Sequence, residues 1–155
     1  MTDLCHSNFL ISIHQALENI STALAVLHGD EIVSLHIAQA RVLSEQCVAP
    51  SDLPAFANSS MDGYAFNSAD IQTTDFELIQ TGISWAGRPF FSKLERGQCV
   101  RIFTGAVLPL GADSVIMQEL VEVNEIRIHF PANTQAQKNI RVKGEDVKQH
   151  DCLLP

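Results

Sequence analysis

Basic residues are scarce in this chain, and their scarcity excludes several classes of partner. The 155 residues contain 10 Lys and Arg against 18 Asp and Glu, which gives a formal net charge of −8 at pH 7. The first basic residue along the chain is Arg41. Nucleic acids and anionic membranes both demand a positively charged face from a protein that binds them. The composition therefore predicts small molecules or proteins as partners, with no nucleic acid and no membrane.

Long apolar runs and paired cysteines are also lacking. No apolar stretch approaches the roughly 20 residues that a membrane helix needs. The short apolar segment at 9–13 has no Lys or Arg before it, so the basic region of a signal peptide is missing. The four cysteines, at positions 5, 47, 99 and 152, show neither CxxC nor zinc spacing. We therefore expect a cytoplasmic protein whose cysteines are structural or free.

Enough apolar sequence remains to build a core, because 46% of the residues are hydrophobic. The clearest element is an amphipathic helix over 12–27, with Ser12 and Gln15 in capping-box positions and Gly29 just past its end. Its apolar positions recur at steps of three and four and are expected to form one packed face: Ile13, Leu17, Ile20, Leu24 and Leu27. A short strand at 31–35 and a short helix at 37–43 are predicted to follow.

After residue 65 helical spacing disappears, and short apolar runs alternate with turn residues. This pattern predicts a β-rich region. The runs at 120–123 and 126–130 flank Asn124 and Glu125, and we expect them to form a hairpin. The other predicted strands are 76–81, 99–103 and 114–118, with a loop at 82–89 after the first of them.

The segment Asn58–Ala65 contains many polar groups and, as a sequence, little that would be buried. Asp62 and Gly63 form a strong turn pair, and prolines at 50 and 54 stiffen the chain before it. One interpretation is an ordinary surface turn, and the other is a loop that presents polar side chains to a ligand. Thr104, directly after the predicted strand 99–103, has the same two interpretations, because a hydroxyl followed by glycine can bind phosphate.

Near the end of the sequence, basic residues surround an acidic pair. Glu145 and Asp146 follow Gly144, and the cations around them are Lys138, Arg141, Lys143 and Lys148. Such a group could bind phosphate through its cations while Asp146 binds a metal. It could equally be a solvated strand edge with weak ion pairs.

Three segments in order match one family. They are Asp52-Leu-Pro-Ala-Phe-Ala-Asn-Ser-Ser-Met-Asp-Gly-Tyr-Ala65, Gly97-Gln-Cys-Val-Arg-Ile-Phe-Thr-Gly-Ala106 and Asn139-Ile-Arg-Val-Lys-Gly-Glu-Asp146. The chain resembles the molybdopterin molybdenumtransferases, the MoeA family that includes the E domain of gephyrin, from about Ile13 to its end. The resemblance covers only the front part of the family's length.

The resemblance implies a function and a set of site residues. Family enzymes insert molybdate, their substrate, into adenylylated molybdopterin in the presence of Mg²⁺ and release AMP, and they act as homodimers. By position, the implied catalytic residues are Asp62, Thr104 and Asp146, with Asp62 and Asp146 also implied as metal ligands. The implied substrate-binding residues are Asn58, Ser60, Arg141 and Glu145.

The sequence departs from the family at a few positions. Ala57 stands where Asp is usual, Ala40 where Gly is usual, and Val142 and Lys143 where arginines are usual. The expected fold is α+β and mostly β, with a mixed lobe made of residues 1–50 and 137–155, a β-rich lobe at 51–136, and the family's C-terminal pterin-binding domain and β-barrel absent. Two other readings stay open: a non-catalytic truncated paralogue that acts as an oligomerisation or scaffold module, and a small-ligand-binding β domain.

Overall fold

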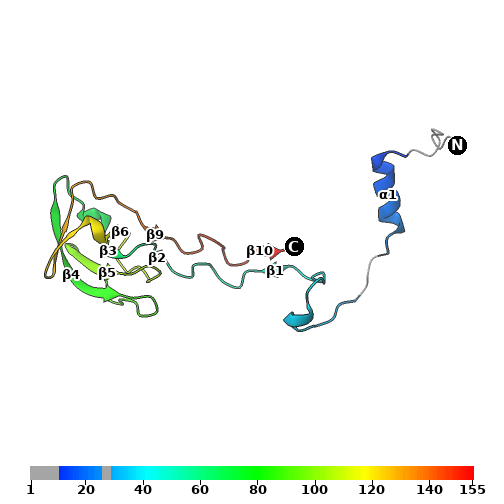
Figure 1. Ribbon diagram of the computed structural model, residues 1–155, viewed down its shortest axis with the longest axis horizontal. Helices are drawn as coiled ribbons and strands as arrows, with labels where there is room; N and C mark the ends of the chain where they lie inside the picture. The colour runs from blue at the N-terminus through cyan, green and yellow to red at the C-terminus, as the bar shows by residue number, and fades with distance from the viewer. Residues whose placement is uncertain (1–10, 26–28) are drawn as a thin grey trace, which may run out of the picture. The chain divides into compact units, whose positions relative to one another are not determined.

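The computed structural model describes residues 11–25 and 29–155 and divides into two units (Figure 1). The first unit ends at Ser44, and the second comprises Glu45–Pro155. Neither unit, in the described ranges, has a helix long and apolar enough to cross a membrane. The predicted lobes, with boundaries near residues 50 and 137, stay a prediction.

The first unit contains the helix α1, Ile13–Ala23. It begins where the sequence predicts, because the Gln15 N–H donates to Ser12 Oγ over 3.1 Å and caps the first turn. It ends earlier than predicted, since Leu24 is already extended at φ −78° and ψ 121°. Leu27, predicted to close the helix, lies outside the described residues.

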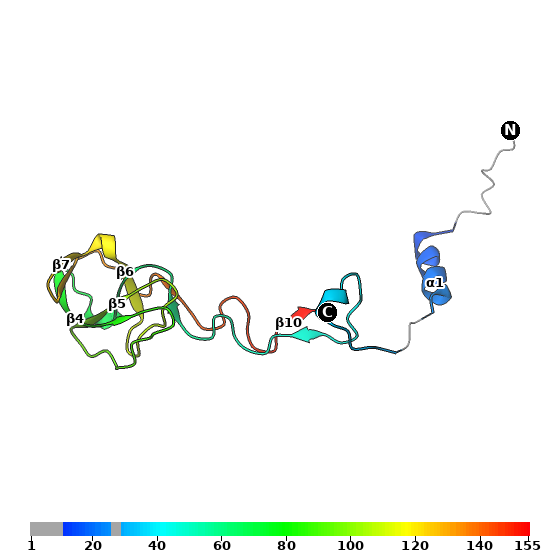
Figure 2. The same ribbon diagram turned by 60° about the horizontal axis from the view of Figure 1, so that its bottom comes forward.

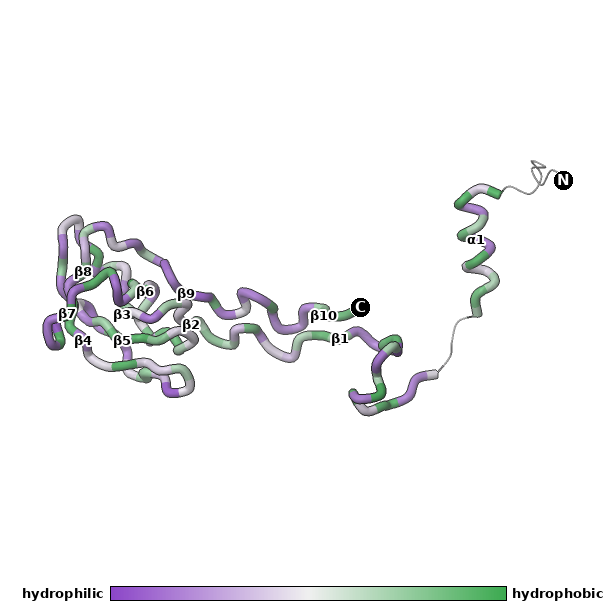
Figure 3. Tube along the Cα trace, in the orientation of Figure 1, coloured by the Kyte–Doolittle hydropathy of each residue, from purple (hydrophilic) through white to green (hydrophobic). Residues whose placement is uncertain are grey.

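The apolar side of α1 is exposed, which corrects the expectation that it packs. Leu17 is 58% exposed and Leu24 is 68% exposed, and α1 has no buried residue. Figure 3 shows hydrophobic and hydrophilic residues alternating along α1. The apolar residues do recur at helical spacing, but no described segment of this unit packs against the apolar side of α1.

Two other predictions for the first unit are wrong. The segments predicted as a strand at 31–35 and a helix at 37–43 contain instead one 3₁₀ turn, η1, Leu35–Ile37. A strand needs a partner for its backbone hydrogen bonds, and the described residues pair none with this segment. The apolar run alone therefore misled the prediction.

The second unit is built around one six-stranded sheet, of which Figure 2 labels β4, β5, β6 and β7. The strand order is β6-β3-β5-β4-β8-β7. The strands are β3 (Gly63–Phe66), β4 (Phe76–Ser84), β5 (Gln98–Ile102), β6 (Ser114–Met117), β7 (Glu122–Asn124) and β8 (Arg127–Phe130). All neighbours run antiparallel except β4 and β5. The predicted strands and the β7–β8 hairpin are confirmed, although β4 extends to Ser84, into the predicted loop. Two further 3₁₀ turns are η2 (Ser68–Asp70) and η3 (Gln118–Leu120).

The core lies on both faces of the sheet. On one face, Phe130 stacks on Phe76 and meets Phe66 edge to face, with both centroid distances 5.1 Å. On the other face, Ile102 and Val115 pack together. The expectation that Asn58–Ala65 buries little is wrong, because Ser59, Gly63, Tyr64 and Ala65 are buried. Tyr64 and Ala65 lacked flanking apolar repeats, so the sequence did not reveal a central strand.

Two short ladders join the early and late parts of the second unit. Strand β1 (Cys47–Val48) pairs with β10 (Cys152–Leu154), and β2 (Asn58–Ser59) pairs with β9 (Ile140–Arg141), both antiparallel. Among the described cysteines, Cys99 is buried, and desolvation raises the pKa of its thiol to about 12. At neutral pH that thiol is therefore a core group without reactivity.

Candidate functional site

Asp62 and Thr104 come together because their strands are neighbours. Asp62 immediately precedes β3, Thr104 follows β5 by two residues, and the antiparallel register pairs Gly63 with Ile102. The backbone N–H and the hydroxyl of Thr104 both donate to Asp62 Oδ1, each over 2.8 Å. Two residues that lie 42 positions apart thus form one hydrogen-bonded unit.

The charge of Asp62 is stabilised at this position. The backbone N–H and then the hydroxyl of Thr104 lower the pKa of Asp62, and the nearby Arg101 lowers it further. The donors bind Oδ1, and the described residues give Oδ2 no hydrogen-bond donor. Asp62 therefore presents an ionised carboxylate with one oxygen available to a ligand.

Arg101 is a neighbour of this unit that the sequence analysis did not single out. Its Nη1 donates to Gly63 O over 2.8 Å, and its guanidinium lies 4.6 Å from the ring centroid of Phe103 and 5.2 Å from that of Tyr64. Phe103 in turn stacks on Trp85 at 4.1 Å. One charge inside the otherwise apolar run 99–103 was the signal that could have identified it.

The segment containing Asn58 and Ser60 lies between the other two matched segments. On one side, Gly105 N–H donates to Ser59 O over 2.8 Å, and Ser59 N–H donates to Ala106 O over 3.0 Å. On the other side, Asn58 pairs with Arg141 in the β2–β9 ladder, drawn as adjacent strands in Figure 1. The three segments that resemble one family are therefore in direct contact.

Asn58 and Ser60 contribute to the contact between the three segments mainly through their backbone groups. Ser60 N–H donates to Asn139 O over 3.0 Å, and the amide of Asn58 reaches Phe56 O at 3.5 Å. The buried Ser59, which the sequence analysis passed over, binds the backbone of Met61 through its hydroxyl. Ser59 thus shapes the turn that leads to Asp62.

Arg141, Glu145 and Asp146 form a second group. Arg141 Nη2 pairs with Asp146 Oδ1, and its Nε lies 3.9 Å from Glu145 Oε1. The hydrogen bond and charge of Asp146, followed by the charge of Glu145, raise the pKa of Arg141. Glu145 Oε2 also accepts the Val142 N–H over 3.0 Å. Arg141, which is half-buried, thus offsets the charge of one of the two exposed carboxylates.

Lys143 belongs to a different pair. Its Nζ lies 3.2 Å from Asp52 Oδ2, and Gln149 N–H donates to Asp52 Oδ1 over 2.8 Å. These contacts, led by the Gln149 N–H, lower the pKa of Asp52. Of the predicted basic shell, Arg141 therefore pairs with the acidic pair, whereas Lys143 pairs with Asp52 instead.

The arrangement of the acidic side chains bears on whether this site could hold the predicted Mg²⁺. Within residues 11–25 and 29–155, no three His, Cys, Asp or Glu side chains are grouped so that they could hold an ion. Arg141 pairs with Asp146 Oδ1 and Thr104 donates to Asp62 Oδ1, so in the described part of the chain each carboxylate has one oxygen, Oδ2, that receives no hydrogen bond. Mg²⁺ in phosphate-handling sites is often bound through one or two carboxylates plus substrate phosphates. The metal roles of Asp62 and Asp146 therefore both stay predictions.

Comparison with known proteins agrees with the fold and the segment matches. The family model of the MoeA N-terminal region (domain I and II) matches residues 11–155. The molybdopterin molybdenumtransferase of Haemophilus influenzae is 38% identical over 94% of this chain and 36% of its own length. That of Nostoc sp. is 34% identical over 81% of this chain and 30% of its own.

Solved structures show the same similarity. Two structures of the molybdopterin biosynthesis MoeA protein of Pyrococcus horikoshii match with TM-scores of 0.73 and 0.77. They are 33% and 28% identical, and they cover 80% and 94% of this chain but 34% and 38% of their own. The chain thus spans about a third of the length of its curated relatives. On the strength of the family match, the segment contacts and the mostly β fold, this chain belongs to the MoeA family and corresponds to its N-terminal region.

Proposed function

We propose that this chain serves molybdenum cofactor biosynthesis as the front part of a molybdopterin molybdenumtransferase. In this proposal the complete enzyme transfers molybdate to adenylylated molybdopterin and releases AMP. The observation that supports it most is the contact between three distant segments around Asp62 and Thr104. The relatives' names support the same reaction class.

Each side chain has a role that its contacts allow. Thr104 holds the carboxylate of Asp62 in one orientation, and the free Asp62 Oδ2 accepts a substrate hydroxyl or contributes one ligand to Mg²⁺. When bound, Mg²⁺ would neutralise phosphate charge. Arg141, Glu145 and Asp146 form the adjoining side of the substrate site, together with Asn58, which pairs with Arg141, and Ser60, which binds Asn139.

The proposal requires parts that other domains supply. Because the chain spans about a third of its relatives, we propose that the pterin is bound mainly elsewhere and that the site is completed in a homodimer. The chain alone should then form no cofactor when mixed with adenylylated molybdopterin, Mg²⁺ and molybdate. Cofactor formation by the isolated chain would contradict this division of roles. A cytoplasmic location remains part of the proposal.

The test uses a chimera of this chain with the remaining domains of the Haemophilus influenzae relative. Asp62→Asn keeps the shape and one acceptor oxygen but removes the charge, so activity should fall by about 10²–10⁴-fold. Asp75→Asn is the matched control, since Asp75 is exposed and its Oδ1 also accepts a backbone N–H, from Ala132 over 2.8 Å. Equal activity of the two variants, both folded, would contradict the role of Asp62.

One observation favours the scaffold reading as a second candidate. The apolar side of α1 is exposed over Ile13, Leu17 and Ile20, and exposed apolar surface often marks an interaction site. In that reading the chain associates through α1 and has no catalytic role. An active chimera that loses activity on Asp62→Asn would exclude it.

A further inference from the structure

Arg101 binds the main chain beside Asp62. It lies on β5 opposite Tyr64 of β3, and its Nη1 donates to Gly63 O over 2.8 Å. The other arm of the guanidinium, Nη2, donates to Oε1 of Gln118, the residue that follows β6. Both acceptor oxygens are uncharged, so these two arms connect chain segments and neutralise no carboxylate. One arginine thus links β5 to β3 and to the end of β6.

Gln118 closes a hydrogen-bond ring with Arg101. Its backbone N–H donates to Asp62 O over 3.1 Å, while its side-chain oxygen accepts from the guanidinium. The carbonyl groups of Asp62 and Gly63 follow each other along the chain, and both are therefore fixed. Arg101 holds the second directly and the first through Gln118. The amide of Gln118 is oriented for this contact, because its Nε2 donates to Glu119 Oε1 over 3.0 Å.

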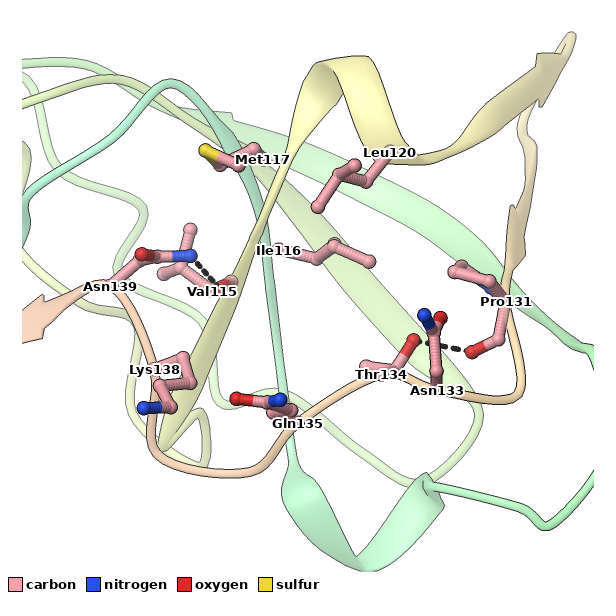
Figure 4. A pocket seen from close by; sticks show the side chains of 10 residues that line it. All are labelled: Val115, Ile116, Met117, Leu120, Pro131, Asn133, Thr134, Gln135, Lys138 and Asn139. Carbon is pink, nitrogen blue, oxygen red and sulfur yellow. Dashed lines mark hydrogen bonds between the residues drawn. The ribbon is translucent and has the colours of Figure 1, made fainter.

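Strand β6, from which Gln118 extends, is itself held on both sides. On one side it pairs with β3. On the other side Asn139 Nδ2 donates to Val115 O over 3.0 Å, drawn as a dashed line in Figure 4. Val115 N–H also donates to Lys138 O over 3.0 Å. The position of Gln118 therefore follows from a strand that is bound at both edges.

Aromatic side chains hold the guanidinium of Arg101 as well. It lies 4.6 Å from the ring centroid of Phe103 and 5.2 Å from that of Tyr64, and such cation–π contacts are attractive. Phe103 stacks on Trp85 with centroids 4.1 Å apart. Trp85 in turn exchanges two backbone hydrogen bonds of 3.0 Å with Arg88. These contacts restrain the arginine before any ligand binds, which lowers the entropy cost of keeping the hydrogen-bond ring closed.

The charge and the shape of this side chain can be separated. A guanidinium presents donors on separate nitrogens of one rigid plane, whereas a lysine carries the same charge on a single nitrogen at the end of a flexible stem. Arg101→Lys therefore keeps the charge near Asp62 and removes the two-armed geometry. If the charge were the only contribution, lysine would replace the arginine without loss.

We infer that Arg101 is a positioning residue of this site, which sets the direction of Asp62 Oδ2 by fixing the main chain at Asp62 and Gly63. Thr104 holds the other oxygen, Oδ1, of the same carboxylate. Without the hydrogen-bond ring, the carboxylate keeps Thr104 as a partner but loses the fixed main chain from which it extends. A misplacement of about 1 Å can lower a catalytic rate roughly 10²-fold. The inference rests on the proposed function of Asp62, but the ring itself can be measured in the chain alone.

The first test measures amide hydrogen exchange in the 155-residue chain. In Arg101→Lys, the N–H groups of Gln118 and Thr104 should exchange at least about 5-fold faster, because both bind Asp62, whose main chain is no longer fixed. Arg127→Lys is the matched control, since Arg127 is exposed on β8 and pairs with a glutamate of β4 over 3.2 Å. It should leave both rates unchanged. Unchanged exchange in a folded Arg101→Lys protein would overturn the inference.

The second test measures kinetics in the chimera with the Haemophilus influenzae domains. Arg101→Lys should lower kcat by about 10–100-fold and change KM by less than about 3-fold, because it alters the direction of a reacting group and keeps the charge. A loss that disappears when activity is normalised to the folded fraction would overturn the inference. So would full activity of Arg101→Lys beside an inactive Arg101→Met, because the charge alone would then suffice.

Gln118 keeps the inference testable even where the Arg101 variants fail to fold. Gln118→Met removes the oxygen that Arg101 binds and should lower kcat about 3–10-fold, as expected for one lost hydrogen bond. Gln118→Glu restores an acceptor there and should recover most of that loss. Full activity of Gln118→Met beside an inactive Asp62→Asn would refute this inference alone. An active Asp62→Asn chimera would instead contradict the proposed function.

Discussion

Replacing Gly63 by Ala tests the packing that positions Asp62. A Cβ at Gly63 would lie 1.8 Å from Ile116 O, whereas real contacts of this kind are almost never under 3.0 Å. The atom it meets is backbone, so no side chain can turn away. Strands β3 and β6 would have to separate by about 1 Å or more, next to the bond from Gln118 N–H to Asp62 O.

The cost follows from these contacts. Overpacking of this kind costs about 1–3 kcal/mol, and weakening two neighbouring backbone hydrogen bonds adds roughly 0.5–1.5 kcal/mol each. Gly63→Ala should therefore lower the free energy of unfolding by about 2–6 kcal/mol. Urea unfolding of the 155-residue chain measures this loss, and hydrogen exchange at Ile116 and Gln118 should become faster.

Gly97→Ala is the control for backbone strain alone. Gly97 has φ 73° and nothing within 4 Å of an added Cβ, so its substitution should cost about 1–2 kcal/mol. Exchange at Ile116 and Gln118 should stay unchanged in this variant. If Gly63→Ala is no more destabilising than Gly97→Ala, and exchange on β6 is unaffected, the close approach of β3 and β6 is refuted.

Further outcomes follow from the same structure. Burial would raise the pKa of Asp113, but the hydroxyl and N–H of Ser68 and the hydroxyl of Ser114 outweigh it and lower that pKa. The unfolded chain then binds the proton more tightly, so the stabilisation is present above the ordinary pKa of 3.8 and is lost as pH falls below it. Thermal melts from pH 6 to 3 should show a shallower acid loss in Asp113→Asn, and parallel curves would contradict this. Leu17→Ala, at an exposed position of α1, should change unfolding by less than about 0.5 kcal/mol, and a loss above about 2 kcal/mol would mean that the helix is buried in a partner. Phe130→Ala should cost about 3–5 kcal/mol, because its ring contacts Phe66 and Phe76, and a loss under 1 kcal/mol would contradict the core described.

Strands in which apolar and polar residues alternate regularly could be predicted from the sequence. Whether an isolated apolar run forms a strand could not. The hairpin of β7 and β8 follows from local turn chemistry at Asn124 and Glu125, where Glu125 adopts φ 55°. The run at 31–35 had the right composition but finds no partner among the residues that the structure describes, and β3 had partners but an uninformative composition. Whether each of these two segments forms a strand depends on pairing with a distant segment, and no local sequence pattern indicates such pairing.

The candidate site shows the same limit. Asp62 and Thr104 were identified by resemblance, but their shared hydrogen bonds depend on the β3–β5 register, which no local pattern specifies. Arg101 was missed because a charge in a strand usually indicates only a solvent-facing position. The exposure of α1 could not be predicted either, because periodicity shows that a face exists but not what covers it.

The central claim is that Asp62 and Thr104 act as one unit of a molybdenum-inserting site. A double-mutant cycle in the chimera tests it: Asp62→Asn, Thr104→Val and the double variant, each measured for kcat/KM and for unfolding free energy. Thr104→Val removes the hydroxyl and keeps the backbone N–H that binds Asp62 Oδ1. Because the two side chains share a hydrogen bond, the double variant should lose less activity than the product of the single losses, with a coupling of about 0.5–3 kcal/mol. Fully multiplicative losses, or an Asp62→Asn protein that is destabilised while its folded fraction stays fully active, would contradict the account.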